Sequence, residues 1–227
     1  MWSRYVMLLL ALMLGTTPLQ TGAAPSPASP PLRLSGLTYE ARSPVGSGDR
    51  VNFSLRGTSG GSVALHIFNV ASDLGMREVR TGSYEAQPAL YTGTYVVRPG
   101  NAVRSGRIFA TLAAREAEVV TASQQAITID ARAPVLAARY PKPGSTLTNA
   151  RPNIAVSIVD LETGVNTASV RLMVNGQNVT GKASISETSV TYNPEVPFRS
   201  GPVRVEVTAA DRARNALRTN WTFTIAP

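Results

Sequence analysis

Apolar and polar residues alternate along most of the chain from residue 32 onward. A period of two places the apolar side chains of a strand on one face and the polar side chains on the other. The alternation is clearest in seven segments, centred on Phe53, Leu65, Ala110, Val156, Leu172, Val205 and Phe223. No long stretch shows the 3.6-residue period of an amphipathic helix. The pattern predicts an all-β protein with antiparallel sheets that each pack on one side.

Glycine, proline and asparagine interrupt these segments where turns are expected. Asn175-Gly176 lies between two strand patterns and predicts a hairpin, because both central residues of a type I′ turn need positive φ. The glycine-rich segment Gly57–Gly61 is interpreted as another hairpin turn. It is followed by a strand pattern and lacks the Lys-Ser/Thr ending of a phosphate-binding loop. Short strands at this spacing are typical of β-sandwiches.

A weak internal repeat divides the strands into two halves. Gly106–Ala114 resembles Gly201–Ala209: each begins with glycine and then alternates, and the offset is 95 residues. That offset is about the size of one immunoglobulin-like sandwich. The segment Asp130–Pro134 breaks the alternation between the halves. We therefore expect two β-sandwich domains in tandem, residues 32–131 and residues 132–227.

The first 31 residues have a different character. One positive charge in Met1–Arg4 precedes the apolar run Tyr5–Leu14, and small residues follow up to Ala24. The run is shorter than the roughly 20 residues that cross a bilayer, so the order indicates a secretory signal peptide over residues 1–23. A retained membrane anchor is the alternative. Residues 24–31 contain four prolines and form the expected extended linker. We expect an exported protein, whether secreted, periplasmic or on the cell surface, without a transmembrane segment after cleavage.

Composition restricts the chemistry. Among 227 residues there is no cysteine and one histidine, His66. Disulfides, thiolate metal sites and thiol nucleophiles are excluded, and a histidine-based triad has one candidate base. His66 lies in an alternating strand, and no Gly-x-Ser-x-Gly motif surrounds a serine. No catalytic residues are therefore predicted, and we expect the protein not to be an enzyme.

The second half resembles the bacterial immunoglobulin-like domains that occur in tandem in exported and surface proteins. The resemblance covers roughly residues 134 to 226. The segments that carry it are Pro141-Lys-Pro-Gly-Ser145, Asp160-Leu-Glu-Thr-Gly164, Val170-Arg-Leu-Met-Val-Asn-Gly176, Tyr192-Asn-Pro194, Asp211-Arg-Ala-Arg-Asn215 and Trp221-Thr-Phe-Thr-Ile225. Glycine is usual in this family at the position of Arg214. The first half, residues 34–130, is similar more loosely. The resemblance implies an architecture and an exported location rather than an activity.

Charge is distributed unevenly. The net charge is +8, and 20 of the 22 basic residues are arginine. Residues 32–131 hold 10 basic and 8 acidic groups, whereas residues 132–227 hold 11 basic and 6 acidic groups. The predicted contacts to anionic envelope polymers are Arg199, Arg204, Arg212, Arg214 and Arg218. An exported location argues against nucleic acid as a partner. Ordinary solvated charge is the alternative interpretation.

The sequence predicts no cofactor, and the one candidate it offers is a calcium ion at one end of the second sandwich. In an immunoglobulin-like topology, the loop after the second strand and the loop before the last strand share one end of the sandwich. The predicted ligands are Asp160, Glu162, Asp211 and Asn215. They would supply only part of the six to eight oxygens that calcium takes. Alternatively, Asp160 and Asp211 hydrogen-bond to the backbone of their own loops.

Aromatic residues raise a second functional hypothesis. Tyr84, Tyr91 and Tyr95 lie within twelve residues, and exposed tyrosines can stack on sugar rings. The alternative, which we favour, is that Tyr95 and a neighbour pack within the sandwich. Trp221 shares its register with Phe223 and Ile225 and is expected in the core. The sequence therefore predicts a scaffold or adhesion-type protein that contacts envelope components or surface proteins. The alternatives are a carbohydrate-binding module and accessory domains of an exported enzyme system.

Overall fold

The computed structural model describes residues 30–79 and 88–227, and within these ranges the chain is almost entirely β. The predicted all-β class is therefore confirmed. Residues 32–227 form one unit that contains two sets of sheets, each around its own cluster of buried hydrophobic side chains. The predicted signal peptide and most of the Pro-rich linker lie outside the described residues.

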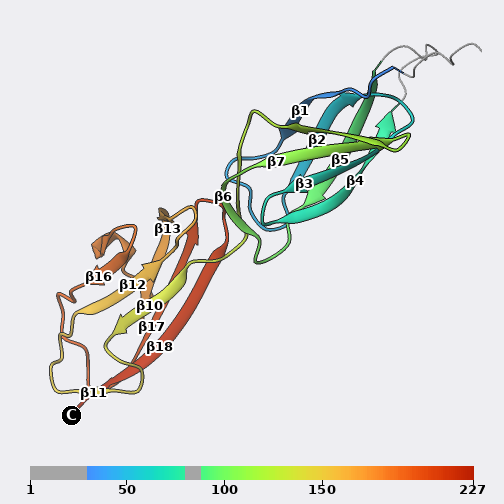
Figure 1. Ribbon diagram of the computed structural model, residues 1–227. Helices are drawn as coiled ribbons and strands as arrows, with labels where there is room; N and C mark the ends of the chain where they lie inside the picture. Colours follow the sequence, from blue (N-terminus) through green and yellow to red (C-terminus); the bar gives the residue numbers. More distant parts are fainter. Residues whose placement is uncertain (1–29, 80–87) are drawn as a thin grey trace, which may run out of the picture. The chain divides into compact units, whose positions relative to one another are not determined.

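The first set of strands builds one seven-stranded sheet that folds around a core (Figure 1). Strand β4 (Ala71–Val79) joins its two halves, because Ala71–Met76 pairs with β3 and Arg77–Val79 pairs with β5. The order is β1-β2-β5-β4-β3-β7-β8, and β6 pairs with β9 in a separate ribbon. The other strands are β1 (Leu34–Glu40), β2 (Arg50–Gly57), β3 (Ser62–Ile67), β5 (Ala89–Val96), β6 (Ala102–Gly106), β7 (Ile108–Ala114), β8 (Ala117–Ala122) and β9 (Ile127–Asp130).

The second set has the strand order of an immunoglobulin-like sandwich. One sheet runs β10-β12-β16-β15 and the other runs β11-β18-β17-β13-β14. Lettered in chain order, these are A-B-E-D and A′-G-F-C-C′, which is the immunoglobulin arrangement. The strands are β10 (Val135–Tyr140), β11 (Thr146–Leu147), β12 (Ile154–Val159), β13 (Val165–Val174), β14 (Gln177–Asn178), β15 (Ser184–Ile185), β16 (Ser189–Tyr192), β17 (Gly201–Asp211) and β18 (Ala216–Ile225), with one 3₁₀ turn, η1 (Thr180–Lys182).

The alternation in the sequence gives the faces of the strands correctly. In the first sandwich, Val51, Phe53 and Leu55 of β2 are buried, and Asn52 and Arg56 are exposed. The seven predicted segments all place their apolar residues in one of the two cores. A one-residue slip of any of these strands would expose its apolar set, so burial fixes the register.

Of the two predicted glycine-containing hairpins, the structure contains one and lacks the other. Asn175 and Gly176 have φ of 47° and 78° and close the β13–β14 hairpin, as predicted for a type I′ turn. The prediction of a hairpin at Gly57–Gly61 is wrong. This segment joins β2 to β3, which are not neighbours, because β2 pairs with β1 and β5 while β3 pairs with β4 and β7. The loop crosses from one half of the folded sheet to the other.

Candidate functional site

Three aspartates meet where the first set of strands ends and the second set begins. Asp130 is the last residue of β9, Asp160 follows β12, and Asp211 is the last residue of β17. One carboxylate oxygen of each lies within 4.8 Å of the other two. Asp130 and Asp211 are fully buried, and Asp160 is half-buried. We call these three residues the aspartate cluster.

Backbone hydrogen bonds hold two members of the cluster within their own loops. The amides of Thr163 and Gly164 donate to Asp160 Oδ1 at 2.9 and 2.5 Å. The amide of Asn215 donates to Asp211 Oδ1 at 2.9 Å. The local interpretation of these aspartates is therefore confirmed. Lone pairs remain for a shared ligand, because Asp160 Oδ2 accepts no hydrogen bond from the described residues and Asp211 Oδ1 accepts only one.

Two side chains of the second sandwich reach the end of β9. The Thr163 hydroxyl donates to Asp130 Oδ2 at 2.6 Å, and Asn215 Nδ2 donates to the Asp130 carbonyl at 2.7 Å. Asn215 Nδ2 also donates to Asp211 Oδ2 at 2.7 Å. These bonds join the β12–β13 loop to the Asp130 carboxylate and the β17–β18 turn to the Asp130 backbone carbonyl. The cluster is thus built from three segments far apart in the sequence.

The electrostatics of the cluster favour a bound positive charge. Burial raises the pKa of Asp211, and the carboxylates of Asp130 and Asp160 raise it further, against the lowering effect of hydrogen bonds from Asn215. Like-charged carboxylates in a buried site cannot all ionise cheaply. A cation would remove that penalty, and an all-oxygen donor set suits Ca²⁺. Three carboxylates supply part of a shell of six to eight oxygens.

The structure brings together two of the four predicted calcium ligands in the aspartate cluster. Asp160 and Asp211 come together as expected, but the Glu162 carboxylate instead faces Arg132 at 3.3 Å. The Asn215 amide nitrogen is used as a donor. Asp130 was missed, because it ends the preceding sandwich and lies 30 residues before Asp160. The only signal for it was its position in the segment where the alternation stops.

A second contact joins the two sandwiches beside the cluster. Arg214 Nη2 lies 2.5 Å from Asp49 Oδ2, and the same oxygen accepts the Gly46 amide at 2.9 Å. Arg214 has a φ of 75°, in the left-handed region that glycine adopts most readily. The turn therefore has a backbone conformation that glycine usually takes, even though it carries arginine. That conformation costs a non-glycine residue about 1–2 kcal/mol, and the ion pair with Asp49 offsets part of it.

We expect Gly46→Ala to disrupt this contact. A Cβ atom at position 46 would lie 2.3 Å from the carbonyl oxygen of Ala213, so one of the two loops must move. The expected loss of unfolding free energy is about 1–3 kcal/mol by denaturant titration. Gly75→Ala is the control, because a Cβ there meets nothing within 4 Å. Equal stability of the two variants would contradict the close approach.

The five predicted polymer-contacting arginines are all exposed but do not share one face. Arg204 on β17 and Arg218 on β18 lie on the outer face of the same sheet. Arg212 and Arg214 lie in the β17–β18 turn and pair with Glu187 and Asp49. Arg204 pairs with Glu206 at 3.1 Å. Arg199 precedes β17 at its opposite end. Only Arg199 and Arg218 of the five have no ion-pair partner among the described residues.

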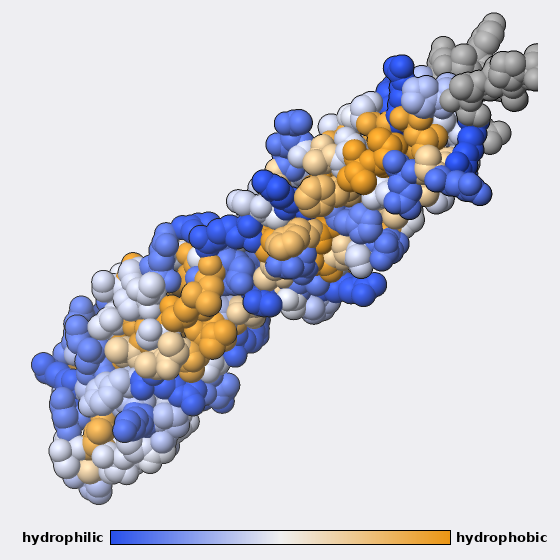
Figure 2. Space-filling view, viewed as in Figure 1, coloured by the Kyte–Doolittle hydropathy of each residue, from blue (hydrophilic) through white to orange (hydrophobic). Residues whose placement is uncertain are grey.

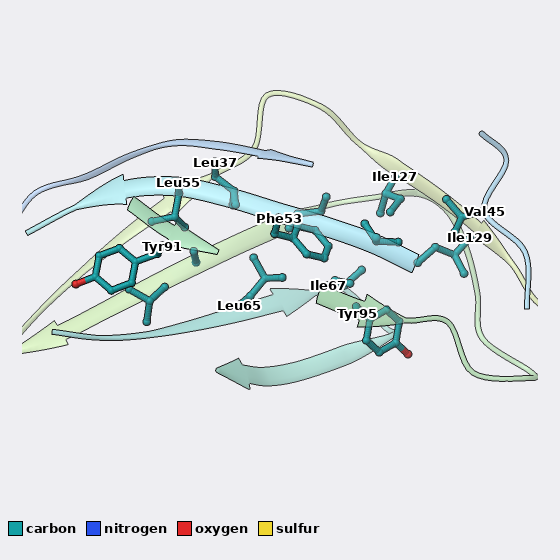
Figure 3. Packing of buried hydrophobic residues seen from close by; sticks show 14 of the residues in the cluster. Leu37, Val45, Phe53, Leu55, Leu65, Ile67, Tyr91, Tyr95, Ile127 and Ile129 are labelled. Atoms are coloured by element: carbon teal, nitrogen blue, oxygen red, sulfur yellow. The ribbon is translucent and has the colours of Figure 1, made fainter. Parts of the chain in front are cut away.

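The sequence singled out three tyrosines as possible sugar-stacking residues, and the two that lie among the described residues are not on the surface. Tyr91 and Tyr95 are buried among aliphatic side chains (Figure 3). The Tyr91 hydroxyl donates to the Thr58 carbonyl at 2.7 Å, and the Tyr95 hydroxyl donates to Asn101 Oδ1. The packing interpretation is confirmed for both residues. Tyr84 lies outside the described residues.

The single histidine has a local role. His66 Nδ1 accepts a hydrogen bond from the Asp73 amide at 3.3 Å. In residues 30–79 and 88–227, no serine or threonine hydroxyl is hydrogen-bonded to His66. Within these ranges the histidine is therefore not paired with a hydroxyl nucleophile. The same ranges contain no helix of the length and apolarity needed to cross a membrane.

Comparisons with known proteins yield structural likeness only. No protein-family model and no curated protein matches the sequence. A structure titled as Rst D1-D2 aligns with a TM-score of 0.41 and 10% identity over 86% of this chain and 98% of the other. Fibronectin(III)-like modules of CbhA from Clostridium thermocellum give 0.32 and 15% over 83% and 94%. CopC from Methylosinus trichosporium OB3b gives 0.34 and 13% over 41% and 94%. Scores this low carry no argument, so the fold assignment rests on the strand order.

Proposed function

We propose that this protein is a non-enzymatic, exported scaffold or adhesion-type protein of the cell envelope, built from two domains in tandem. The observation that carries the proposal is the use of the aromatic side chains. Tyr91, Tyr95, Trp221 and Phe223 all lie in the two cores, so these rings are not free to stack on sugars, whereas the five arginines singled out in the second sandwich are exposed. The signal-like first 23 residues and the resemblance to bacterial immunoglobulin-like domains support export.

The finer proposal is weak, reversible contact with anionic envelope polymers through the second sandwich. On the outer face of its larger sheet, Arg171 of β13 lies opposite Thr208, and Thr208 lies opposite Arg218. This row adds Arg171 to the predicted residues. Arginine presents a planar fork that matches carboxylate and phosphate groups. Exposed charges are screened beyond about 8 Å in physiological salt, so such contacts are salt-sensitive.

Binding to purified anionic and neutral envelope polysaccharides across a salt series tests this proposal. We expect the protein to bind anionic fractions and to lose this binding as salt rises. Arg218→Gln should weaken binding about two- to fivefold, the range of one exposed charge contact. Arg56→Gln, an exposed arginine on β2 of the other sandwich, should leave affinity unchanged. Salt-insensitive binding to neutral glycan would favour a carbohydrate-binding module instead.

We further propose that the aspartate cluster binds Ca²⁺ and so fixes the end of β9 to the two loops of the second sandwich. The ion would be held by Asp130, Asp160 and Asp211. Glu162 and Asn215 lie outside this cluster of carboxylates. A bound positive charge would offset the burial and, after it, the carboxylate repulsion that raise the pKa of Asp211. A cation would then make the connection between the sandwiches stiffer, which suits a scaffold that bears load or holds other components at a fixed distance.

A further inference from the structure

A pocket of about 840 Å³ lies beside the connection between the sandwiches, on the side of β6. Its wall includes the β3–β4 turn, strand β6, the start of β7 and the β12–β13 loop. The lining residues used below are Phe68, Arg104, Arg107, Phe109, Leu161 and Glu162. We call it the Phe68 pocket. Its volume falls within the range of about 300–1,000 Å³ typical of small-molecule sites.

The pocket exposes apolar side chains that the cores leave out. Phe68 is 58% exposed and Leu161 is 76% exposed, although both are large hydrophobic residues. On the face drawn in Figure 2, hydrophobic residues reach the surface in patches between hydrophilic ones. Phe68 is fixed at this position because its amide donates to the Arg107 carbonyl at 3.0 Å. Exposed apolar surface that lines a concavity marks a binding site more often than isolated exposed residues do.

The charge at the pocket is positive. Arg104 Nη2 donates to the carbonyls of Leu161 and Glu162, both at 2.6 Å, and among the described residues no carboxylate forms an ion pair with its guanidinium. Arg107 is exposed and has no side-chain hydrogen bond or ion pair within the described ranges. The Glu162 carboxylate is directed to Arg132 at 3.3 Å. Arg104 thus holds in place the β12–β13 loop, which forms one wall of the pocket. Arg107 remains available to a ligand.

We propose that the Phe68 pocket binds small amphiphilic anions, with an aryl or alkyl body and one acidic group. The body would lie against Phe68, Phe109 and Leu161. The acidic group would pair with the planar fork of Arg107, which can make two parallel hydrogen bonds to a carboxylate or sulfonate. This site is separate from the five arginines discussed above, so its failure and the failure of polymer binding are distinguishable.

Two fluorescent probes that differ in one group test the proposal. 1-Anilinonaphthalene-8-sulfonate carries the acidic group, and N-phenyl-1-naphthylamine has the same ring system without it. We expect the folded protein to bind the sulfonate probe more tightly. Arg107→Gln should weaken the sulfonate probe about five- to tenfold and leave the neutral probe within about twofold. Phe68→Ala should weaken both probes about tenfold, because both use the apolar wall.

Matched controls separate pocket binding from general dye binding. Arg56→Gln removes an exposed arginine of the same sandwich and should leave both affinities unchanged. Decanoate should displace the sulfonate probe, and decanol should displace it far less. Thermal melting checks that both pocket variants fold, since the two side chains are exposed. Equal affinity of the two probes for the wild-type protein, or wild-type affinity in Arg107→Gln and Phe68→Ala, would overturn the proposal.

Discussion

Trp221→Ala is expected to lower the unfolding free energy by about 3–5 kcal/mol, the range for truncating a large aromatic side chain in a core. Trp221 is 4% exposed and lies opposite Val205 in the β17–β18 ladder. The Arg139 guanidinium carbon lies 5.9 Å from the centre of its ring, so the indole also makes a cation–π contact. Denaturant unfolding followed by circular dichroism measures the loss.

Trp221→Phe is the matched control. Trp221 Nε1 is buried and has no hydrogen-bond partner among the described residues, and such a group costs about 1–3 kcal/mol. Phenylalanine keeps most of the apolar contact and removes this donor, so its destabilisation should be much smaller than that of alanine. Unchanged stability of Trp221→Ala would show that the side chain is not part of the core.

Calcium is expected to raise the stability of the protein by about 2.7 kcal/mol when its free concentration is one hundred times the dissociation constant. The rise follows if the ion binds the folded aspartate cluster and not the unfolded chain. Melting curves in calcium and in chelator should therefore differ by several degrees. Coincident curves would remove the calcium proposal and leave the fold assignment untouched.

Asp160→Asn provides the sharpest variant for that experiment. Its Oδ1 can still accept the amides of Thr163 and Gly164, so the loop keeps its hydrogen bonds. In chelator, the variant should be at least as stable as the wild type, because one repelling charge is gone. In calcium, it should gain little. Glu118→Gln, an exposed carboxylate on β8, should respond to calcium as the wild type does.

The strand pattern could be predicted because it depends on local information. A side chain that alternates with polar neighbours has one face to bury, and this is true of Val51, Phe53 and Leu55 whichever strand lies next to them. The Asn175-Gly176 turn depends on the φ preferences of its own two residues. Trp221 follows the register of Phe223 and Ile225. These features required no knowledge of distant contacts.

The pairing of strands could not be derived from the same information. Gly57–Gly61 has the composition of a hairpin, yet it joins β2 to β3, which lie in different halves of the folded sheet. A turn sequence indicates only that the chain changes direction. Which strands pair with each other depends on packing across the whole core. The sugar-binding hypothesis required exposed tyrosines, and it met a similar difficulty. Packing across the core buries Tyr91 and Tyr95, which the local sequence does not decide.

The sequence by itself determined the all-β class, the faces of the strands, and the proximity of Asp160 and Asp211, which follows from the loop positions in an immunoglobulin-like topology. Only the tertiary structure added Asp130 to these carboxylates, directed Glu162 to Arg132, and distributed the five arginines over different parts of the second sandwich. The physical reason is the range of the forces involved. Burial of alternating side chains is decided strand by strand. The charges, in contrast, acquire their partners where loops from distant segments meet, and those distances are set by how two separately packed cores are joined.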